Sequence, residues 1–174
     1  MNIKRISLLL AIFSASNAVQ AQNSCDAKCM ADIATQYMTD VAEQDWSKLP
    51  WADRVRYTEN NVAMMIGDGF WGAGPSASDG AFIIADESTG NVLWYGSTAE
   101  HGQAAYHALR LKVEEGRISE VESYLGREGM PDLFAPLAGY GLDDAFNETV
   151  SSPAGRDALT SIVDGYFDSK QLND

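Results

Sequence analysis

A glutamate on an otherwise apolar strand face is the first residue in this sequence that could do chemistry. Residues 54–59 read R-V-R-Y-T-E, and alternation places Val55, Tyr57 and Glu59 on one face of a predicted strand. An isolated buried carboxylate is unfavourable, so Glu59 needs either a partner or a function. In a pocket it would be a general acid or base, and the Tyr57 hydroxyl would donate to a developing oxyanion. The alternatives are a solvated Glu59 that caps the turn at Asn60, and a Tyr57 that only packs in the core.

Two further residues are candidates to line the same pocket. His107 shares the parity of the apolar residues in a predicted strand at 103–113, so it is either a base or orienting group, or a histidine at the edge of the core. Trp71 follows a glycine-rich segment and either walls the mouth of a pocket or packs in the core. His101 falls in a predicted turn and is expected to face solvent.

The last predicted strand, residues 117–127, carries several charged side chains. Its apolar residues break strict alternation, which predicts a bulge near Glu120. If the bulge turns Glu122 inward, this carboxylate would share a proton with Glu59, or pair with Arg110 or Arg127 as a buried ion pair. The alternative is that these side chains form an exposed charged face.

The sequence gives little support to a metal site or to nucleophilic catalysis. Cys25 and Cys29 are the two cysteines, and neither has finger-like spacing to His101 or His107. The phosphate-loop, dinucleotide and G-x-S-x-G motifs are missing, so we expect no cofactor and no metal. If a helix has begun by Cys25, the two cysteines lie about 6 Å apart at Cα, and a local disulfide is predicted.

The first 21 residues have the pattern of a signal peptide. Lys4 and Arg5 precede an apolar run, and V-Q-A at 19–21 offers a cleavage site, so the mature chain is expected to start at Gln22 in a secreted or periplasmic location. Cleavage changes the formal net charge of the 174-residue chain from −13 to −15. Such an acidic surface repels nucleic acid and anionic membranes, and no later apolar run has membrane length.

Hydrophobic periodicity predicts an α+β domain with its first helix wrapped by a curved sheet. A 3- and 4-residue apolar spacing predicts helices at 26–44 and 155–169, and residues 128–153 have the composition of a linker. Predicted strands cover residues 54–59, 62–66, 81–86, 92–98, 103–113 and 117–127.

The two predicted helices resemble each other. I-A-T-Q-Y-M-T-D at 33–40 matches I-V-D-G-Y-F-D-S at 162–169, with an Ile four residues before a Tyr in both. Either residues 154–174 begin a truncated second copy of the domain, or two amphipathic helices are alike by chance.

Three segments carry a resemblance to a known family. L-P-W-A-D-R-V-R-Y-T-E-N-N-V, G-D-G-F-W and A-L-R-L-K-V-E-E-G-R-I-S-E-V-E resemble a secreted, functionally undescribed subgroup of the SnoaL-like branch in the nuclear-transport-factor-two-like superfamily. The resemblance implies a cystatin-like cone over residues 22–127, with N-terminal helices packed in the concave face of a curved, mostly antiparallel sheet. Enzymes of this superfamily hold one or two ionisable groups in a deep apolar cone and use no cofactor; other members only bind or associate.

Two functional hypotheses follow. The first is a cofactor-free lyase, isomerase or cyclase that acts on a small apolar or carbonyl-bearing molecule, with Glu59, Tyr57 and His107 in catalysis and with Trp71, Glu122, Arg110 and Arg127 lining the pocket. The second is a non-catalytic domain that binds a small ligand or forms a homodimer through its sheet. The second hypothesis expects the cone to be plugged by Met64, Met65 and Trp71, whereas the first requires Glu59 inside an open cone.

Overall fold

The computed structural model describes residues 25–76, 81–127 and 151–171. The predicted signal peptide and most of the predicted linker, including Asn147 in the possible glycosylation motif N-E-T, therefore lie outside the described residues. The elements are α1 (Ala27–Glu43), a 3-10 turn η1 (Trp46–Lys48), β1 (Trp51–Glu59), β2 (Val62–Met64), β3 (Ala81–Asp86), β4 (Asn91–Glu100), β5 (Gln103–Glu114), β6 (Arg117–Arg127) and α2 (Arg156–Gln171).

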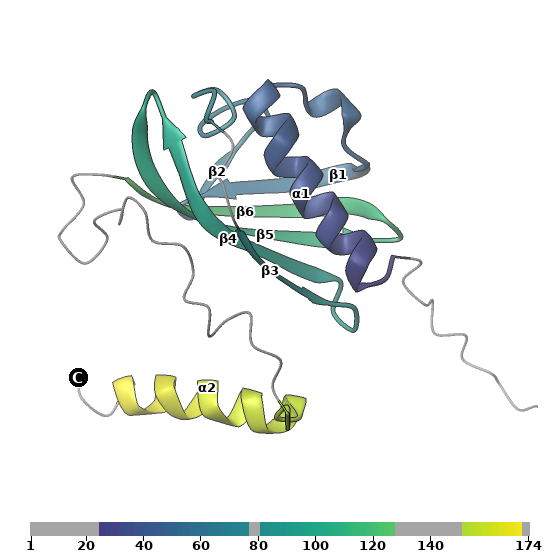
Figure 1. Ribbon diagram of the computed structural model, residues 1–174, viewed down its shortest axis with the longest axis vertical. Helices are drawn as coiled ribbons and strands as arrows, with labels where there is room; N and C mark the ends of the chain where they lie inside the picture. Colours follow the sequence, from purple (N-terminus) through teal and green to yellow (C-terminus); the bar gives the residue numbers. More distant parts are fainter. Residues whose placement is uncertain (1–24, 77–80, 128–150, 172–174) are drawn as a thin grey trace, which may run out of the picture.

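The strands form one curved sheet in the order β2-β1-β6-β5-β4-β3. Every neighbouring pair is antiparallel except β1 and β6, which run parallel. The α1 helix lies across the concave face of this sheet (Figure 1). The predicted α+β cone with a mostly antiparallel sheet is confirmed, although a single α-helix and a 3-10 turn stand where several N-terminal helices were expected.

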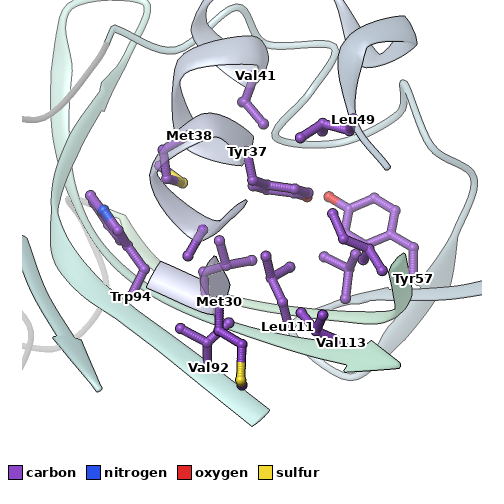
Figure 2. Close-up of a cluster of buried hydrophobic side chains, with 14 of the residues drawn as sticks. Met30, Tyr37, Met38, Val41, Leu49, Tyr57, Val92, Trp94, Leu111 and Val113 are labelled. Atoms are coloured by element: carbon purple, nitrogen blue, oxygen red, sulfur yellow. The ribbon is translucent and has the colours of Figure 1, made fainter. Parts of the chain in front are cut away.

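The core fills the space between α1 and the sheet. Side chains at 3- and 4-residue spacing give α1 one apolar face, and alternate residues of β4, β5 and β6 point toward it. Figure 2 shows Tyr37 and Val41 of α1 facing Leu111 and Val113 of β5 across this layer. Its buried members include Met30, Ala34, Tyr37, Met38, Val41, Val92, Trp94, Leu109, Leu111, Val113, Val121 and Leu125.

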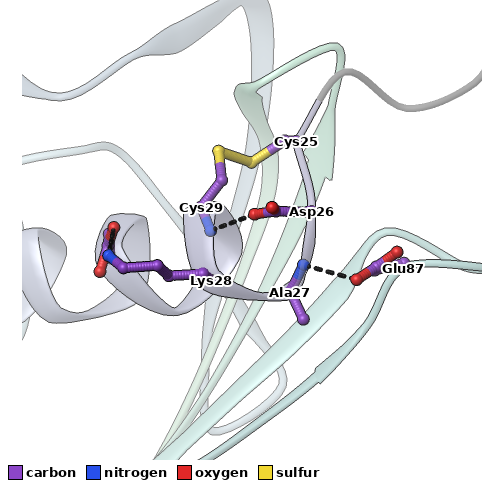
Figure 3. The surroundings of a disulfide bond; sticks show 7 residues. Cys25, Asp26, Ala27, Lys28, Cys29 and Glu87 are labelled. Atoms are coloured by element: carbon purple, nitrogen blue, oxygen red, sulfur yellow. Dashed lines mark hydrogen bonds and ion pairs between the residues drawn. A yellow bond between two sulfur atoms is a disulfide. The ribbon is translucent and has the colours of Figure 1, made fainter.

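The first turn of α1 is fixed by three local contacts. Asp26 caps the helix, accepting a hydrogen bond from the Cys29 N–H at 2.8 Å. Cys25 and Cys29 form a disulfide with their Cα atoms 5.2 Å apart. The Ala27 N–H donates to Glu87 at 2.8 Å, which joins the helix start to the turn between β3 and β4 (Figure 3).

An asparagine turn aligns β1 with β6. Asn60 and Asn61 have φ values of 47° and 64°, a left-handed conformation that asparagine tolerates in a tight hairpin. The Asn60 side chain exchanges two hydrogen bonds with the backbone of Leu125, at 2.9 and 3.2 Å. The end of β1 is therefore locked beside the end of β6, which brings Glu59 close to Arg127. The β2 strand stops at Met64 rather than at the predicted Ile66.

The α2 helix lies apart from the core. None of its residues is buried, and Arg156 in its first turn pairs with Asp86 at 2.6 Å and donates to Ser88 at 2.9 Å. Among the described helices, α2 included, none combines the length and apolar character that a membrane span requires.

Candidate functional site

Glu59 lies inside the cone with both carboxylate oxygens engaged. Only 7% of the residue is exposed. Its Oε2 accepts hydrogen bonds from the Phe70 N–H at 2.7 Å and from the Tyr57 hydroxyl at 3.1 Å. Its Oε1 accepts from Nη2 of Arg127 at 2.9 Å. The carboxylate is therefore buried, as the acid/base hypothesis requires, but it is held by three donors of the protein itself.

Arg127 lies between two carboxylates. Its Nε donates to Glu100 Oε2 at 2.5 Å, and its Nη2 donates to Glu100 Oε1 at 3.0 Å and to Glu59. These hydrogen bonds, led by those to Glu100, raise the pKa of the guanidinium. Within the described part of the chain, Nη1 has no hydrogen-bond partner, and 42% of the side chain is exposed.

A pocket of about 350 Å³ opens over this ion-pair cluster. It lies between the glycine-rich segment after β2 and the turn that joins β4 to β5. Its polar walls come from Arg127, Glu100, His101 and Gln103, and the remaining walls are small residues: Gly69, Ala73, Ala104 and Ala105. Glu59, Tyr57 and His107 are not among the residues that line it.

Gly69 shapes the contact between the loop and Glu59. Its φ of +58° is a left-handed conformation, and a Cβ at this position would clash with Glu59 Oε2 and lie 2.9 Å from Met64 Cε. The missing side chain lets the loop approach closely enough for the Phe70 N–H to reach the carboxylate.

His107 is fully buried on the concave face. Its Nε2 lies 2.8 Å from the Ser123 hydroxyl, and its ring packs against Phe70 and Trp94 with centroids 4.4 and 5.7 Å away. Its Nδ1 has no partner. Burial, assisted by the nearby charge of Arg127, lowers the pKa of His107 from 6.5 to about 3. The structure therefore places a neutral histidine in the core, in contact with neither Glu59 nor the pocket.

The tyrosine and tryptophan candidates fill the cone. Trp71 is 1% exposed and donates its indole N–H to the Tyr37 hydroxyl at 2.8 Å. Tyr57 is also buried, and burial is the main reason why its pKa is raised. Phe70 and Trp71, with Met64 partly buried beside the core, occupy the space that a deep pocket would need, while Met65 is largely exposed. Of the predicted trio, Trp71 is thus buried and Met64 partly buried, Met65 is exposed, and Phe70 is a buried residue that was not predicted.

The two remaining candidates lie on the opposite face of the sheet. Arg110 donates to Glu122 at 2.8 Å and to Glu120 at 2.7 Å, and all three alternate with the inward residues of β5 and β6. The register shift that marks the predicted bulge falls at Ser119, and it leaves Glu122 outside. The structure thus does not bring Glu122 or Arg110 to Glu59, whereas it does bring Arg127 there. A homodimer through this outer face stays a prediction.

Glu100 is the site residue that sequence reasoning missed. The predicted strand ended at Thr98 and left Glu100 in a turn, but β4 continues to Glu100. The parity of Val92, Trp94 and Thr98 would have placed Glu100 on the inner face, had the strand been extended by two residues.

A metal is not suggested by the arrangement, because the described residues contain no group of three or more His, Cys, Asp or Glu that could hold one.

Comparisons with known proteins agree with this architecture. No family model and no curated protein matches the sequence. A protein of unknown function with a cystatin-like fold from Methylobium petroleophilum is 16% identical with a TM-score of 0.50, and the match covers 75% of this chain and 97% of that one. A proposed ketosteroid isomerase from Kribbella flavida is 14% identical (TM-score 0.48, coverage 78% and 90%), and a proposed hydroxylase from Streptomyces galilaeus is 11% identical (TM-score 0.48, coverage 78% and 95%). The likeness to the cystatin-like structure concerns the fold alone, and the chain has the cystatin-like cone fold that its sequence predicts.

Proposed function

We propose that this domain binds a small uncharged molecule in the pocket over Arg127, and that the guanidinium donates a hydrogen bond to a carbonyl or ether oxygen of the ligand. The observation that carries the proposal is that Nη1 of Arg127, at the wall of a pocket of about 350 Å³, has no hydrogen-bond partner among the described residues, while Nε and Nη2 are fixed by two carboxylates. A donor whose orientation is fixed before binding loses little entropy when the ligand arrives.

The charge of the cluster favours a neutral ligand. Glu59 and Glu100 together carry two negative charges against the single positive charge of Arg127. An anionic ligand would therefore approach a cluster of net negative charge. A compact molecule with one acceptor matches both the size and the polarity of the walls.

The acid/base hypothesis for Glu59, Tyr57 and His107 stays a prediction, and the geometry favours it less. A general base must reach the proton that it abstracts, directly or through one water molecule. Glu59 accepts hydrogen bonds from Arg127, Phe70 and Tyr57. The single O–H of Tyr57 is donated to Glu59 rather than to a ligand. Binding without chemistry is therefore the better supported of the two functions.

A ligand-observed NMR experiment tests the proposal. We would measure saturation transfer from the protein to acetophenone, cyclohexanone and δ-valerolactone, with toluene as a ligand of similar size that lacks an acceptor. We expect transfer to the carbonyl compounds and a loss of affinity of about tenfold in Arg127→Gln.

Arg110→Gln is the matched control, because Arg110 also pairs with two glutamates but lies on the outer face. It should bind like the wild type. Equal binding by Arg127→Gln, with its fold verified by circular dichroism, would refute the assignment. Conversion of any of these compounds in the wild type, abolished by Glu59→Gln, would instead establish the catalytic hypothesis.

We also propose that the protein works outside the cytoplasm. The support is the Cys25–Cys29 disulfide, which persists in oxidising compartments, together with the signal-like first 21 residues of the sequence. N-terminal sequencing of the protein recovered from its source should begin at Gln22. A start at Met1 would contradict export through this segment.

A further inference from the structure

The α2 helix carries an apolar stripe that none of the other described helices or strands buries. Its residues Leu159, Ile162, Val163, Tyr166 and Phe167 are between 53% and 68% exposed, and their 3- and 4-residue spacing places them on one face. Helices of this length are marginal in water and gain most of their stability by burying such a face. The stripe is therefore a contact surface whose partner has to be identified.

The stripe of α2 repeats the sheet-facing surface of α1. The first residues of the two helices, Ala27 and Arg156, are 129 residues apart, and the same offset relates every position of the stripe. In α1 these positions are buried or packed against the core on the concave face of the sheet. The pairs are Met30 with Leu159, Ile33 with Ile162, Ala34 with Val163, Tyr37 with Tyr166, and Met38 with Phe167.

The matched positions of α1 and α2 include a tyrosine, Tyr37 in α1 and Tyr166 in α2. Tyr37 is the largest buried side chain of α1, and its hydroxyl accepts the indole N–H of Trp71 from the loop. Tyr166 stands at the equivalent place with 56% of its surface exposed. A general amphipathic helix has no need of a tyrosine at this position, whereas a helix that fills a cone uses it to reach across the concave face.

Other surfaces fit α2 less well. The concave face of the described sheet is already filled by α1 (Figure 1). The contacts of Arg156 with Asp86 and Ser88 hold the first turn of α2 and leave the stripe uncovered. A membrane surface favours basic residues on the polar face, but α2 has Asp157, Asp164 and Asp168 there.

We propose that α2 is the first helix of a second unit of the same fold, and that its stripe packs into the concave face of that unit's own sheet. The partner is thus a curved, mostly antiparallel sheet with an apolar concave face, like the one formed here by β1 to β6. This proposal concerns an interaction surface and does not depend on the function proposed for the Arg127 pocket.

A graft of the α2 stripe onto α1 tests the fit in the full 174-residue chain. Ile33 and Tyr37 already match, so Met30→Leu, Ala34→Val and Met38→Phe complete the graft. We expect cooperative unfolding with a thermal midpoint within about 10 °C of the wild type and a retained near-ultraviolet circular dichroism spectrum. The matched control carries the same side chains in another order, as Met30→Leu, Ala34→Phe and Met38→Val, and should be at least about 10 °C less stable than the graft. Equal midpoints, or two variants that both fail to fold, would overturn the proposal.

A second measurement tests the partner directly. Hydrogen exchange of residues 156–171 should be slow in the protein purified from its source and fast in the 174-residue chain alone. Equal exchange in the two samples would overturn the proposal. Protection of the 174-residue chain by phosphatidylglycerol vesicles would also overturn it, because the stripe would then belong to a membrane contact.

Discussion

Replacing Glu59 by glutamine tests whether its carboxylate stabilises the fold or takes part in catalysis. The amide keeps the shape of the side chain but has one acceptor, whereas Glu59 presents Oε2 to the Phe70 N–H and Oε1 to Arg127. In either orientation of the amide, its NH₂ group therefore faces a donor. A hydrogen bond to a buried charged group contributes about 1.5–3 kcal/mol. Because Arg127 keeps Glu100 and is 42% exposed, we expect a loss near the lower end, about 2 kcal/mol.

The assay is urea unfolding followed by tryptophan fluorescence, because Trp71 is adjacent to the residue whose N–H binds Glu59. Glu122→Gln is the control on the outer face, where a partly exposed ion pair contributes about 0–1 kcal/mol. A double-mutant cycle with Arg127→Met should show that the effects of Glu59→Gln and Arg127→Met are not additive. If Glu59→Gln is within about 0.5 kcal/mol of the wild type and the cycle is additive, the ion pair does not stabilise the fold, and our reasoning about the site is wrong.

Two further predictions concern the surroundings of this carboxylate. The pKa of His107 is about 3 when folded against 6.5 when unfolded, so its contribution to stability is complete above pH 6.5 and declines as the pH falls toward 3. His107→Gln should flatten the difference in unfolding free energy between pH 7 and pH 5, on the order of 2 kcal/mol; an unchanged difference in this variant would contradict the burial argument. Gly69→Ala should destabilise the fold by more than about 2 kcal/mol, since the methyl displaces Glu59. Gly102 also has a positive φ but open space around it, so Gly102→Ala should lose only about 1 kcal/mol in the same urea unfolding assay. A larger loss at Gly102 than at Gly69 would show that backbone strain, not the clash, is decisive.

The long strands β5 and β6 were predictable because one face of each is buried. Alternation of apolar residues marked both strands to within one residue of their observed ends, and the same pattern placed Glu59 and His107 on the inner face. The same rule would have found Glu100, but Gly96 lies in the middle of β4 and offers no side chain to continue the pattern. A turn prediction at residues 100–102 then cut the strand short.

The partnership of Glu59 with Arg127 was not readable from the sequence. It depends on the parallel pairing of β1 with β6, which sets Glu59 opposite Ser123 and so brings it close to Arg127, 68 positions away in the sequence. This pairing is fixed by Asn60 through its contacts with Leu125. Periodicity reports which face a residue occupies, but it carries no information about which strand lies alongside. Without knowledge of this pairing, the sequence could not choose among three candidate partners for Glu59, namely Glu122, Arg110 and Arg127. Of these, only Arg127 lies on the inner face of the sheet.

The filling of the cone decides how the site should be understood. Glu59 needs a positively charged partner because it is buried. Arg127 supplies this charge, and hydrogen bonds from its Nε and Nη2 to Glu100 hold the guanidinium in place. Phe70 and Trp71 are buried in the interior, and the pocket is lined by Arg127 and Glu100 but not by Glu59. Among the described residues, Nη1 of Arg127 has no hydrogen-bond partner, whereas both oxygens of Glu59 and of Glu100 accept hydrogen bonds. The proposed binding function therefore rests on the guanidinium rather than on either carboxylate.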